Sequence, residues 1–186
     1  DLNYDPANQV LVTVGVSQAL DLAMRAILDP GDEVIIPEPT YVSYIPCVSL
    51  SGGIPITVPT NMENSFRVQP ADIEARITPK TKAILIGYPN NPTGATATRD
   101  QFAKAIEFAR RHDVVLMHDA CYSEIAYDGY QPLSLLQVEG ARDVAVEFHS
   151  LSKSYNMTGW RLGMAVGNPE VIKALHTIQS TLHSVP

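Results

Sequence analysis

Short runs of β-branched and other apolar residues alternate along this chain with longer segments whose apolar residues recur every three or four positions. Several short runs are apolar at consecutive positions, which is typical of strands buried on both faces of a sheet. The longer segments predict helices at Ser17–Leu28, which Asp29-Pro30-Gly31 ends, and at Thr98–Arg111, where Thr98 and Gln101 have capping-box spacing.

This alternation of strands and helices predicts an α/β fold with three α/β/α layers around a mostly parallel sheet of about seven strands. The polar segment Asn61–Ser65 predicts a loop. The predicted strands are Val10–Val14, Glu33–Ile36, Ile54–Val58, Lys82–Gly87, Val114–His118, Asp143–His149 and Leu162–Gly167.

Length and charge narrow the classes of function. The 186 residues suffice for one hydrophobic core, and no repeat or linker divides them, so we expect a single domain over residues 1–186. Acidic side chains outnumber basic ones by 20 to 13, which gives a formal charge of -7 and disfavours binding to nucleic acid. No apolar run approaches the roughly 18–20 residues that span a bilayer, so no membrane partner is expected. Two distant cysteines, Cys47 and Cys121, favour a reducing, cytoplasmic setting.

The first candidate site is the glycine turn Val14-Gly15-Val16-Ser17-Gln18-Ala19, between the first predicted strand and helix. Free N–H groups and the helix dipole favour an anion at such a turn, although most glycine turns only connect elements. Gly15-x-Ser17-x-Ala19 also approximates the nucleophile elbow of α/β-hydrolases, and the order Ser17, Asp119, His149 matches their triad. A hydrolase is therefore an alternative interpretation.

Three further motifs follow predicted strands, where open α/β sheets bind ligands. Tyr88-Pro89-Asn90-Asn91-Pro92-Thr93-Gly94 is an irregular turn that can offer an Asn amide. In His118-Asp119-Ala120-Cys121-Tyr122 a buried acid must cap an element or meet a cation, and the spacing is not that of a structural metal site. In the segment from Ser150 to Gly163, Lys153 is either a surface residue or an activated nucleophile.

Taken together, these motifs resemble the class I/II pyridoxal-phosphate (PLP) aminotransferases of fold type I, in order and in spacing. The resemblance runs from about Val10 to the end of the chain. It rests on the phosphate-loop glycine Gly15, Tyr41 in Pro39-Thr40-Tyr41, the turn Asn91-Pro92-x-Gly94, the pair Asp119-x-x-Tyr122, and Ser150-x-x-Lys153 with Arg161 eight residues on.

The resemblance implies a role for each of these residues. Lys153 would form a Schiff base with the aldehyde of the cofactor and then move the α-proton of the substrate. Asp119 would keep the pyridine nitrogen protonated. Asn91 and Tyr122 would bind the phenolic oxygen of the ring, and Tyr41 would stack on its face. The phosphate would bind the N–H groups of Val16 and Ser17, the hydroxyls of Ser150 and Ser152, and the guanidinium of Arg161.

The stretches around Asp119 and Lys153 look most like LL-diaminopimelate aminotransferases and the related aspartate aminotransferase-like branch. The resemblance implies an amino acid and a 2-oxo acid as substrates, commonly with glutamate and 2-oxoglutarate as one pair, and a homodimer. It also implies that an N-terminal segment and a C-terminal small domain with the substrate-carboxylate arginine lie outside this chain, so this piece is expected to be a fragment whose own activity is doubtful.

Three alternatives remain open. A β-lyase of the same fold shares the cofactor site, because elimination begins with the same adduct as transamination. A folded piece that binds no cofactor is the second. A Ser17 hydrolase is the minor alternative. It gives no role to Lys153, Arg161 or the Asn91 turn, and Ala19 replaces the usual glycine of the nucleophile elbow.

Overall fold

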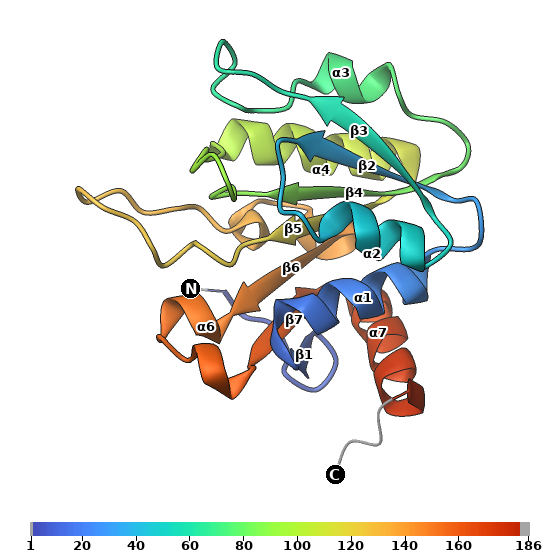
Figure 1. Cartoon of the computed structure of the whole chain (residues 1–186), viewed down its shortest axis with the longest axis vertical. Helices are drawn as coiled ribbons and strands as arrows, with labels where there is room; N and C mark the ends of the chain where they lie inside the picture. Colours follow the sequence, from blue (N-terminus) through green and yellow to red (C-terminus); the bar gives the residue numbers. More distant parts are fainter. Residues whose placement is uncertain (1, 183–186) are drawn as a thin grey trace.

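A computed structural model describes residues 2–182, and its seven strands form one sheet in the order β1-β7-β6-β5-β4-β2-β3 (Figure 1). Six strands run in one direction, and β7 runs antiparallel to both of its neighbours, β1 and β6. The predicted α/β class and the mostly parallel sheet are confirmed. The strands are β1 (Val10–Thr13), β2 (Glu33–Glu38), β3 (Ile54–Pro59), β4 (Thr81–Gly87), β5 (Val115–Asp119), β6 (Ala145–Ser150) and β7 (Gly163–Gly167).

The predicted strand Asp143–His149 begins two residues too early. Asp143 and Val144 belong to a short helix, α5 (Ala141–Val144), and β6 starts at Ala145. Gly140 precedes this helix with a φ of 83°, and the Asp143 carboxylate accepts a hydrogen bond from Arg110 Nη2 at 3.1 Å. The tertiary contact with Arg110 favours a helical turn where the apolar run alone predicted a strand.

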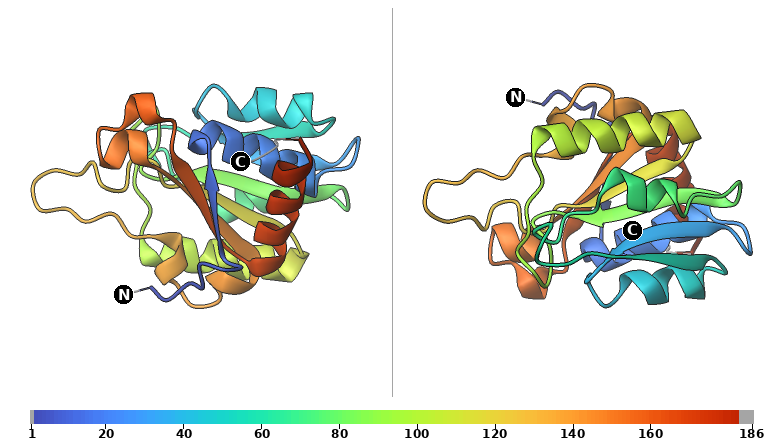
Figure 2. Two further views of the ribbon diagram at one scale, coloured as in Figure 1. Left: turned by 90° about the horizontal axis from the view of Figure 1, so that it is seen from below. Right: turned by 90° about the horizontal axis from the view of Figure 1, so that it is seen from above.

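Helices cover both faces of the sheet (Figure 2). The helices α1 (Gly15–Ile27), α2 (Tyr44–Leu50) and α7 (Pro169–Leu182) pack on one face. The opposite face is covered by α3 (Pro70–Glu74), α4 (Arg99–His112), α5 and the 3₁₀ turn η1 (Leu135–Gln137). The short α6 (Leu151–Ser154) and the 3₁₀ turn η2 (Thr158–Trp160) lie between β6 and β7. The three layers agree with the predicted architecture.

The two helices predicted from the sequence are present, with boundaries shifted by a few residues. At the start of α4 the capping box forms: the Thr98 hydroxyl accepts from Gln101 N–H at 3.3 Å, and Gln101 Oε1 accepts from Thr98 N–H at 2.8 Å. This helix ends at Asp113, whose φ of 54° turns the chain away. The first helix begins at Gly15, two residues before the predicted start.

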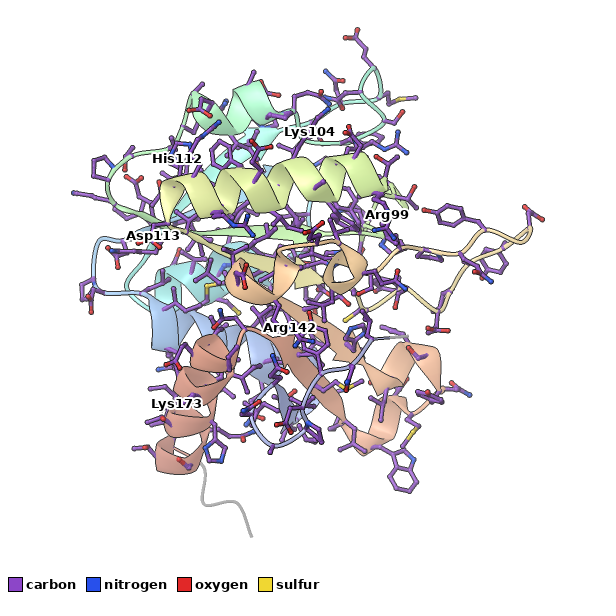
Figure 3. All side chains as sticks on the ribbon, turned by 180° about the vertical axis from the view of Figure 1, so that it is seen from behind. Arg99, Lys104, His112, Asp113, Arg142 and Lys173 are labelled. Atoms are coloured by element: carbon purple, nitrogen blue, oxygen red, sulfur yellow. The ribbon has the colours of Figure 1, made fainter. Side chains whose placement is uncertain are left out.

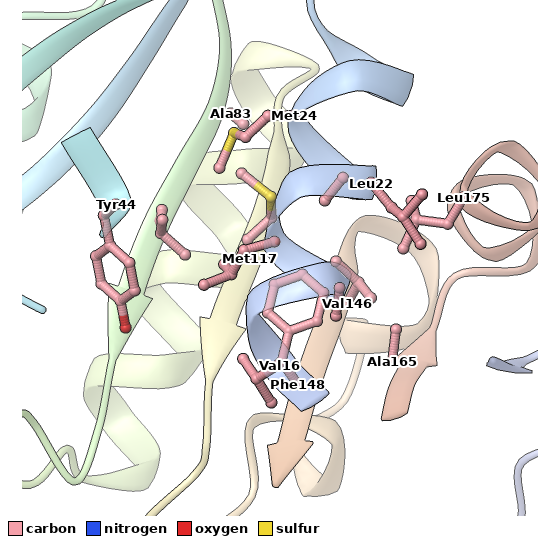
Figure 4. Close-up of a cluster of buried hydrophobic side chains, with 14 of the residues drawn as sticks. Val16, Leu22, Met24, Tyr44, Ala83, Met117, Val146, Phe148, Ala165 and Leu175 are labelled. Atoms are coloured by element: carbon pink, nitrogen blue, oxygen red, sulfur yellow. The ribbon is translucent and has the colours of Figure 1, made fainter. Parts of the chain in front are cut away.

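The core under α1 fixes the strands that lead to the candidate site. Met117 of β5 and Val146 and Phe148 of β6 are fully buried beneath Val16 and Leu22 of α1 (Figure 4). Close packing of this kind leaves little freedom for the backbone that follows. The carboxyl ends of β4, β5 and β6 lie side by side, since Gly87 pairs with Asp119 and Asp119 with Phe148. The loops after these three ends carry three of the predicted motifs.

Candidate active site

A cavity of about 180 Å³ lies at the carboxyl ends of β4, β5 and β6, beside the first turn of α1. Every residue predicted from the sequence as a site residue lines it except Gly15, which lies against the lining residue Arg161. The predicted residues in the lining are Val16, Ser17, Tyr41, Asn91, Asp119, Tyr122, Ser150, Ser152, Lys153 and Arg161; Tyr44, Pro89, Cys121 and Thr158 complete it.

Asp119 is the last residue of β5, and its side chain is held by two hydrogen bonds. Its Oδ2 accepts from the Tyr44 hydroxyl at 2.7 Å, and its Oδ1 accepts from the Cys121 N–H at 3.1 Å. The residue is only 8% exposed, and within residues 2–182 no basic side chain forms an ion pair with it. A buried carboxylate is costly without a positive partner. The cavity therefore offers a fixed carboxylate suited to a cationic or N–H group of a ligand.

Tyr44 is a residue of the cavity that the sequence alone did not indicate. Burial raises the pKa of Tyr44 well above its ordinary value, and the adjacent Asp119 raises it further, so the hydroxyl stays protonated and donates. The side chain would collide with any Cβ at position 87, since that atom would lie 2.8 Å from the hydroxyl, and Gly87 leaves the space free. Tyr44 follows Tyr41 by three residues, and the centroids of the two rings lie 5.7 Å apart. This spacing is the feature of the sequence that could have indicated that both rings reach the same site.

Lys153 of α6, Tyr122 and Asn91 converge on the cavity from the connections that follow β6, β5 and β4. Lys153 Nζ lies 5.6 Å from the centroid of the Tyr122 ring, within cation–π range. Asn91 Nδ2 donates to the Tyr122 hydroxyl at 3.4 Å. The turn that carries Asn91 is closed by hydrogen bonds from Asn90 N–H to Ala95 O at 2.8 Å and from Gly94 N–H to Asn90 O at 2.8 Å. An amine, a phenol and an amide thus face the same space.

The remaining lining residues form an anion-binding corner at the start of α1. Gly15 has a φ of 67°, and a Cβ there would lie 2.7 Å from Arg161 Nη2, so the glycine lets the guanidinium approach the turn. Arg161 Nη1 also donates to Ser152 Oγ at 3.4 Å and to Thr158 O at 3.2 Å. Free N–H groups at a helix N-terminus beside a guanidinium and serine hydroxyls suit phosphate oxygens.

The structure does not assemble the catalytic triad of the hydrolase interpretation. His149 Nε2 lies 2.8 Å from Glu147 Oε1, and Asp119 accepts from Tyr44 rather than from a histidine. Cys121 is buried, and burial followed by the charge of Asp119 raises the pKa of its thiol. The thiol is therefore protonated and behaves as a small apolar residue.

Four basic side chains outside the cavity, those of Arg99, Lys104, Arg142 and Lys173, are exposed at the surface. Figure 3 shows Arg99 and Lys104 on α4, and Arg142 and Lys173 on other elements, with none of the four in the cavity lining. Arg99 donates to the Gln137 carbonyl at 3.0 Å, and Arg142 lies over the Tyr4 ring at 4.7 Å. In residues 2–182, Arg161 is the arginine that reaches the cavity.

The family profile described as aminotransferase class I and II matches residues 1–186, the whole of the chain. The chain belongs to the class I and II aminotransferases. Enzymes of this family use pyridoxal 5'-phosphate, and the resemblance stated from the sequence is thereby confirmed. The residues around the cavity fit this cofactor, because a buried unpaired carboxylate, an amine and an anion-binding corner lie in one space.

Three similar proteins illustrate the match. LL-diaminopimelate aminotransferase from Syntrophobacter fumaroxidans is 46% identical over 183 residues, which cover 98% of this chain and 47% of that protein. The aromatic aminotransferase from Pyrococcus horikoshii has a TM-score of 0.93 and 34% identity over 100% of this chain and 49% of its own. Aspartate aminotransferase from Thermotoga maritima has a TM-score of 0.89 and 39% identity, covering 94% of this chain and 46% of its own.

The chain therefore spans about half the length of the relatives it matches. Among residues 2–182, no helix is long and apolar enough to cross a membrane. In the same part of the chain, no group of three histidine, cysteine or acidic side chains is arranged to hold a metal ion.

Proposed function

We propose that the protein is a PLP-dependent aminotransferase in which Lys153 and Asp119 form the reacting end of the cofactor site. The observation that carries the proposal is the buried Asp119 carboxylate, which has two hydrogen-bond donors and no basic partner, in the same cavity as the Lys153 amine. A carboxylate in that environment suits a protonated pyridine nitrogen, and an amine suits an aldehyde. The names of the relatives, all aminotransferases, support the same reaction class.

When bound, PLP supplies an aldehyde for covalent attachment and a ring that accepts electrons from the α-carbon of an amino acid. Lys153 would hold the cofactor through its amine, and the same amine, once free, would take a proton from the α-carbon of the substrate and return one. Asp119 holds a proton on the pyridine nitrogen, with its own orientation fixed by Tyr44 and the Cys121 N–H. Lys153 would therefore transfer the proton, and Asp119 would control how strongly the ring accepts electrons.

The other cavity residues orient the cofactor. Tyr41 would pack against the ring, and the Asn91 amide and the Tyr122 hydroxyl would donate to its phenolic oxygen. The phosphate is bound by the N–H groups of Val16 and Ser17, which the Gly15 turn exposes. The hydroxyls of Ser150 and Ser152 and the guanidinium of Arg161 complete this phosphate site.

The substrates we propose are an amino acid of the aspartate or LL-diaminopimelate type and a 2-oxo acid, with glutamate and 2-oxoglutarate as one pair. Support comes from the 46% identity to the Syntrophobacter enzyme that is named for LL-diaminopimelate. The solved structures named for aromatic and aspartate substrates have lower identities, 34% and 39%. We further propose that residues 1–186 form a single cofactor-binding domain, that the protein acts as a homodimer, and that it works in the cytoplasm.

Borohydride trapping tests the cofactor site. The protein is mixed with PLP, reduced, digested, and mapped by mass spectrometry. We expect one adduct per chain, on the peptide that contains Lys153, and no adduct at that site in Lys153→Ala. The matched control is Lys173→Ala, which removes an exposed lysine of α7 and should leave the Lys153 adduct unchanged. Adducts spread over Lys80, Lys82, Lys104 and Lys173, or none at all, would contradict the proposal.

A further inference from the structure

A second group of ionisable side chains lies on the other face of the sheet, behind the cavity. Successive residues of a strand point to opposite faces, so His118 points away from its neighbour Asp119 and packs against the α4 face. Its ring lies 5.0 Å from that of Phe102 on α4, and both His118 and Glu147 are fully buried. The cofactor role proposed above uses neither residue.

The partners of His118 determine where its protons lie. Its Nε2 is 2.9 Å from the carbonyl oxygen of Tyr88, and a carbonyl only accepts, so Nε2 carries a hydrogen. Its Nδ1 is 2.8 Å from Glu147 Oε2. An ionised Glu147 likewise only accepts, which places a hydrogen on Nδ1 as well.

The groups around the Glu147 carboxylate favour its ionised form, because hydrogen-bond donors reach both of its oxygens. Leu135 N–H donates to Oε2 at 2.8 Å, the Ser134 hydroxyl donates to Oε1 at 2.7 Å, and His149 Nε2 lies 2.8 Å from Oε1. Burial would raise the pKa of Glu147, but hydrogen bonds from His118 and His149 outweigh burial and lower it.

Both ends of this network connect to the cofactor cavity. Tyr88, whose carbonyl His118 binds, is followed directly by Pro89, Asn90 and Asn91, and Asn91 donates to the Tyr122 hydroxyl in the cavity. Ser134 and Leu135 lie at the end of the long loop that begins after Asp119, the last residue of β5. The network thus ties the end of β4 to β5, β6 and η1.

We propose that His118 is a positioning residue: with a proton on each ring nitrogen, it is held between Glu147 and the Tyr88 carbonyl and fixes the turn that presents Asn91 to the cofactor cavity. A neutral histidine has a single N–H, so either Glu147 or the Tyr88 carbonyl would face the lone pair of a ring nitrogen. The titratable groups around the ring are Glu147 and His149 of β6, the Tyr88 phenol beyond its own carbonyl, and Asp119 on the opposite face of β5. Only the importance of Asn91 as a cofactor ligand rests on the function proposed above.

The proton positions are tested on the protein without cofactor. Nitrogen-15 NMR of the histidine rings at pH 7 should show both nitrogens of His118 protonated and slowly exchanging with water. A single protonated ring nitrogen at pH 7 would overturn the proposal. Because this experiment contains no PLP, it succeeds or fails independently of the borohydride experiment.

The positioning role is tested on the PLP-loaded protein with His118→Gln, which offers one donor nitrogen and one acceptor oxygen in place of two donor nitrogens. We expect the pH at which the visible absorption of bound PLP changes to shift by about half a unit or more, because Asn91 is less well placed against its acceptor. The control His176→Gln, at an exposed position of α7, should leave that pH unchanged.

Ser134→Ala provides a milder second variant, since it removes one donor to Glu147 at a partly buried position. It should shift the pH of the absorption change by a smaller amount in the same direction. If His118→Gln does not fold, this variant provides the test of the positioning role. A loss of thermal stability with no shift in either folded variant would reduce the network to a purely structural role and overturn the proposal.

Discussion

The two oxygens of Asp119 each have a single donor, the Tyr44 hydroxyl on one side and the Cys121 N–H on the other. Hydrogen bonds to charged groups contribute more than neutral ones, about 1.5–3 kcal/mol each. The Tyr44 hydroxyl is therefore the side-chain group that keeps the carboxylate in one orientation without neutralising it.

Replacing Tyr44 by phenylalanine removes this donor and leaves the ring in place. We expect Tyr44→Phe to lower the free energy of unfolding by about 1–3 kcal/mol, because a buried carboxylate oxygen loses its partner. Urea unfolding measures the change. Tyr127→Phe is the matched control at a 76% exposed position, where the change should stay within about 0.5 kcal/mol. Equal stabilities of the two variants would refute the role given to Tyr44.

Single residues were predictable where a local motif carried them. Lys153, Asp119 and Asn91 each follow a recognisable strand, and the order of the motifs along the chain identified them. Tyr44 was not predictable in the same way, because its partner Asp119 lies 75 residues away and only the tertiary structure brings the two side chains together. The pairing of His118 with Glu147 could not be predicted from the sequence either, because the two residues lie 29 positions apart.

Among the elements, the contact between α1 and β7 fixes the position of the Gly15 turn, which we propose binds phosphate. A Cβ on Gly163, the first residue of β7, would lie 2.8 Å from the carbonyl carbon of Gly15 and 2.9 Å from the nitrogen of Val16. These atoms are backbone and cannot rotate away. Gly163 therefore permits the start of α1 to approach the sheet closely, beside the N–H groups proposed to bind phosphate.

Gly163→Ala should push this turn outward. We expect a loss of about 1–3 kcal/mol in the free energy of unfolding, as for other overpacked sites, together with weaker binding of PLP. Thermal unfolding and fluorescence titration with PLP measure the two effects. Gly159→Ala serves as the control, since its Cβ would meet no atom within 4 Å. If both variants bind PLP as the original protein does, the close approach has no bearing on the site.

The elements themselves were largely predictable, because buried strands give apolar runs and the helices give an apolar face. The predicted strand at Glu33–Ile36, for example, appears as β2 over Glu33–Glu38. The antiparallel direction of β7 was not visible in its sequence, since a buried strand has the same pattern in either direction. The helical turn of α5 was not visible in its apolar run, since the positive φ of Gly140 and the contact with Arg110 both lie outside that run.

Across the whole molecule, Glu147 joins β6 to β5 and to the end of the long loop through buried hydrogen bonds. Its pKa lies below the ordinary value of 4.5 in the folded protein. The unfolded chain therefore takes up a proton on this group at a higher pH than the folded protein does. The stabilisation from Glu147 is fully present above about pH 4.5 and is lost as the pH falls through the folded-state pKa.

A pH titration of protein labelled with carbon-13 glutamate should follow the protonation of Glu147 directly. The Glu147 carboxyl signal should keep its ionised shift below pH 4.5, where a single-glutamate reference peptide is already half protonated. The free energy of unfolding from urea titrations should decrease over the same range of pH. Protonation of Glu147 at or above pH 4.5 in the folded protein would show that the buried network does not hold the charge.

The cavity, the family and the proposed proton transfer all lead to one reaction, the transfer of an amino group to the cofactor. The most direct measurement is a single turnover of the PLP-loaded protein at the full length of its relatives, of which this chain spans about half. The donors are nitrogen-15 glutamate and, in parallel, nitrogen-15 aspartate and LL-diaminopimelate. We predict that at least one donor leaves as its 2-oxo acid while its nitrogen-15 is recovered on the bound cofactor. Release of the label as free ammonia, as in a lyase, or no transfer from any of the three, would contradict the aminotransferase proposal.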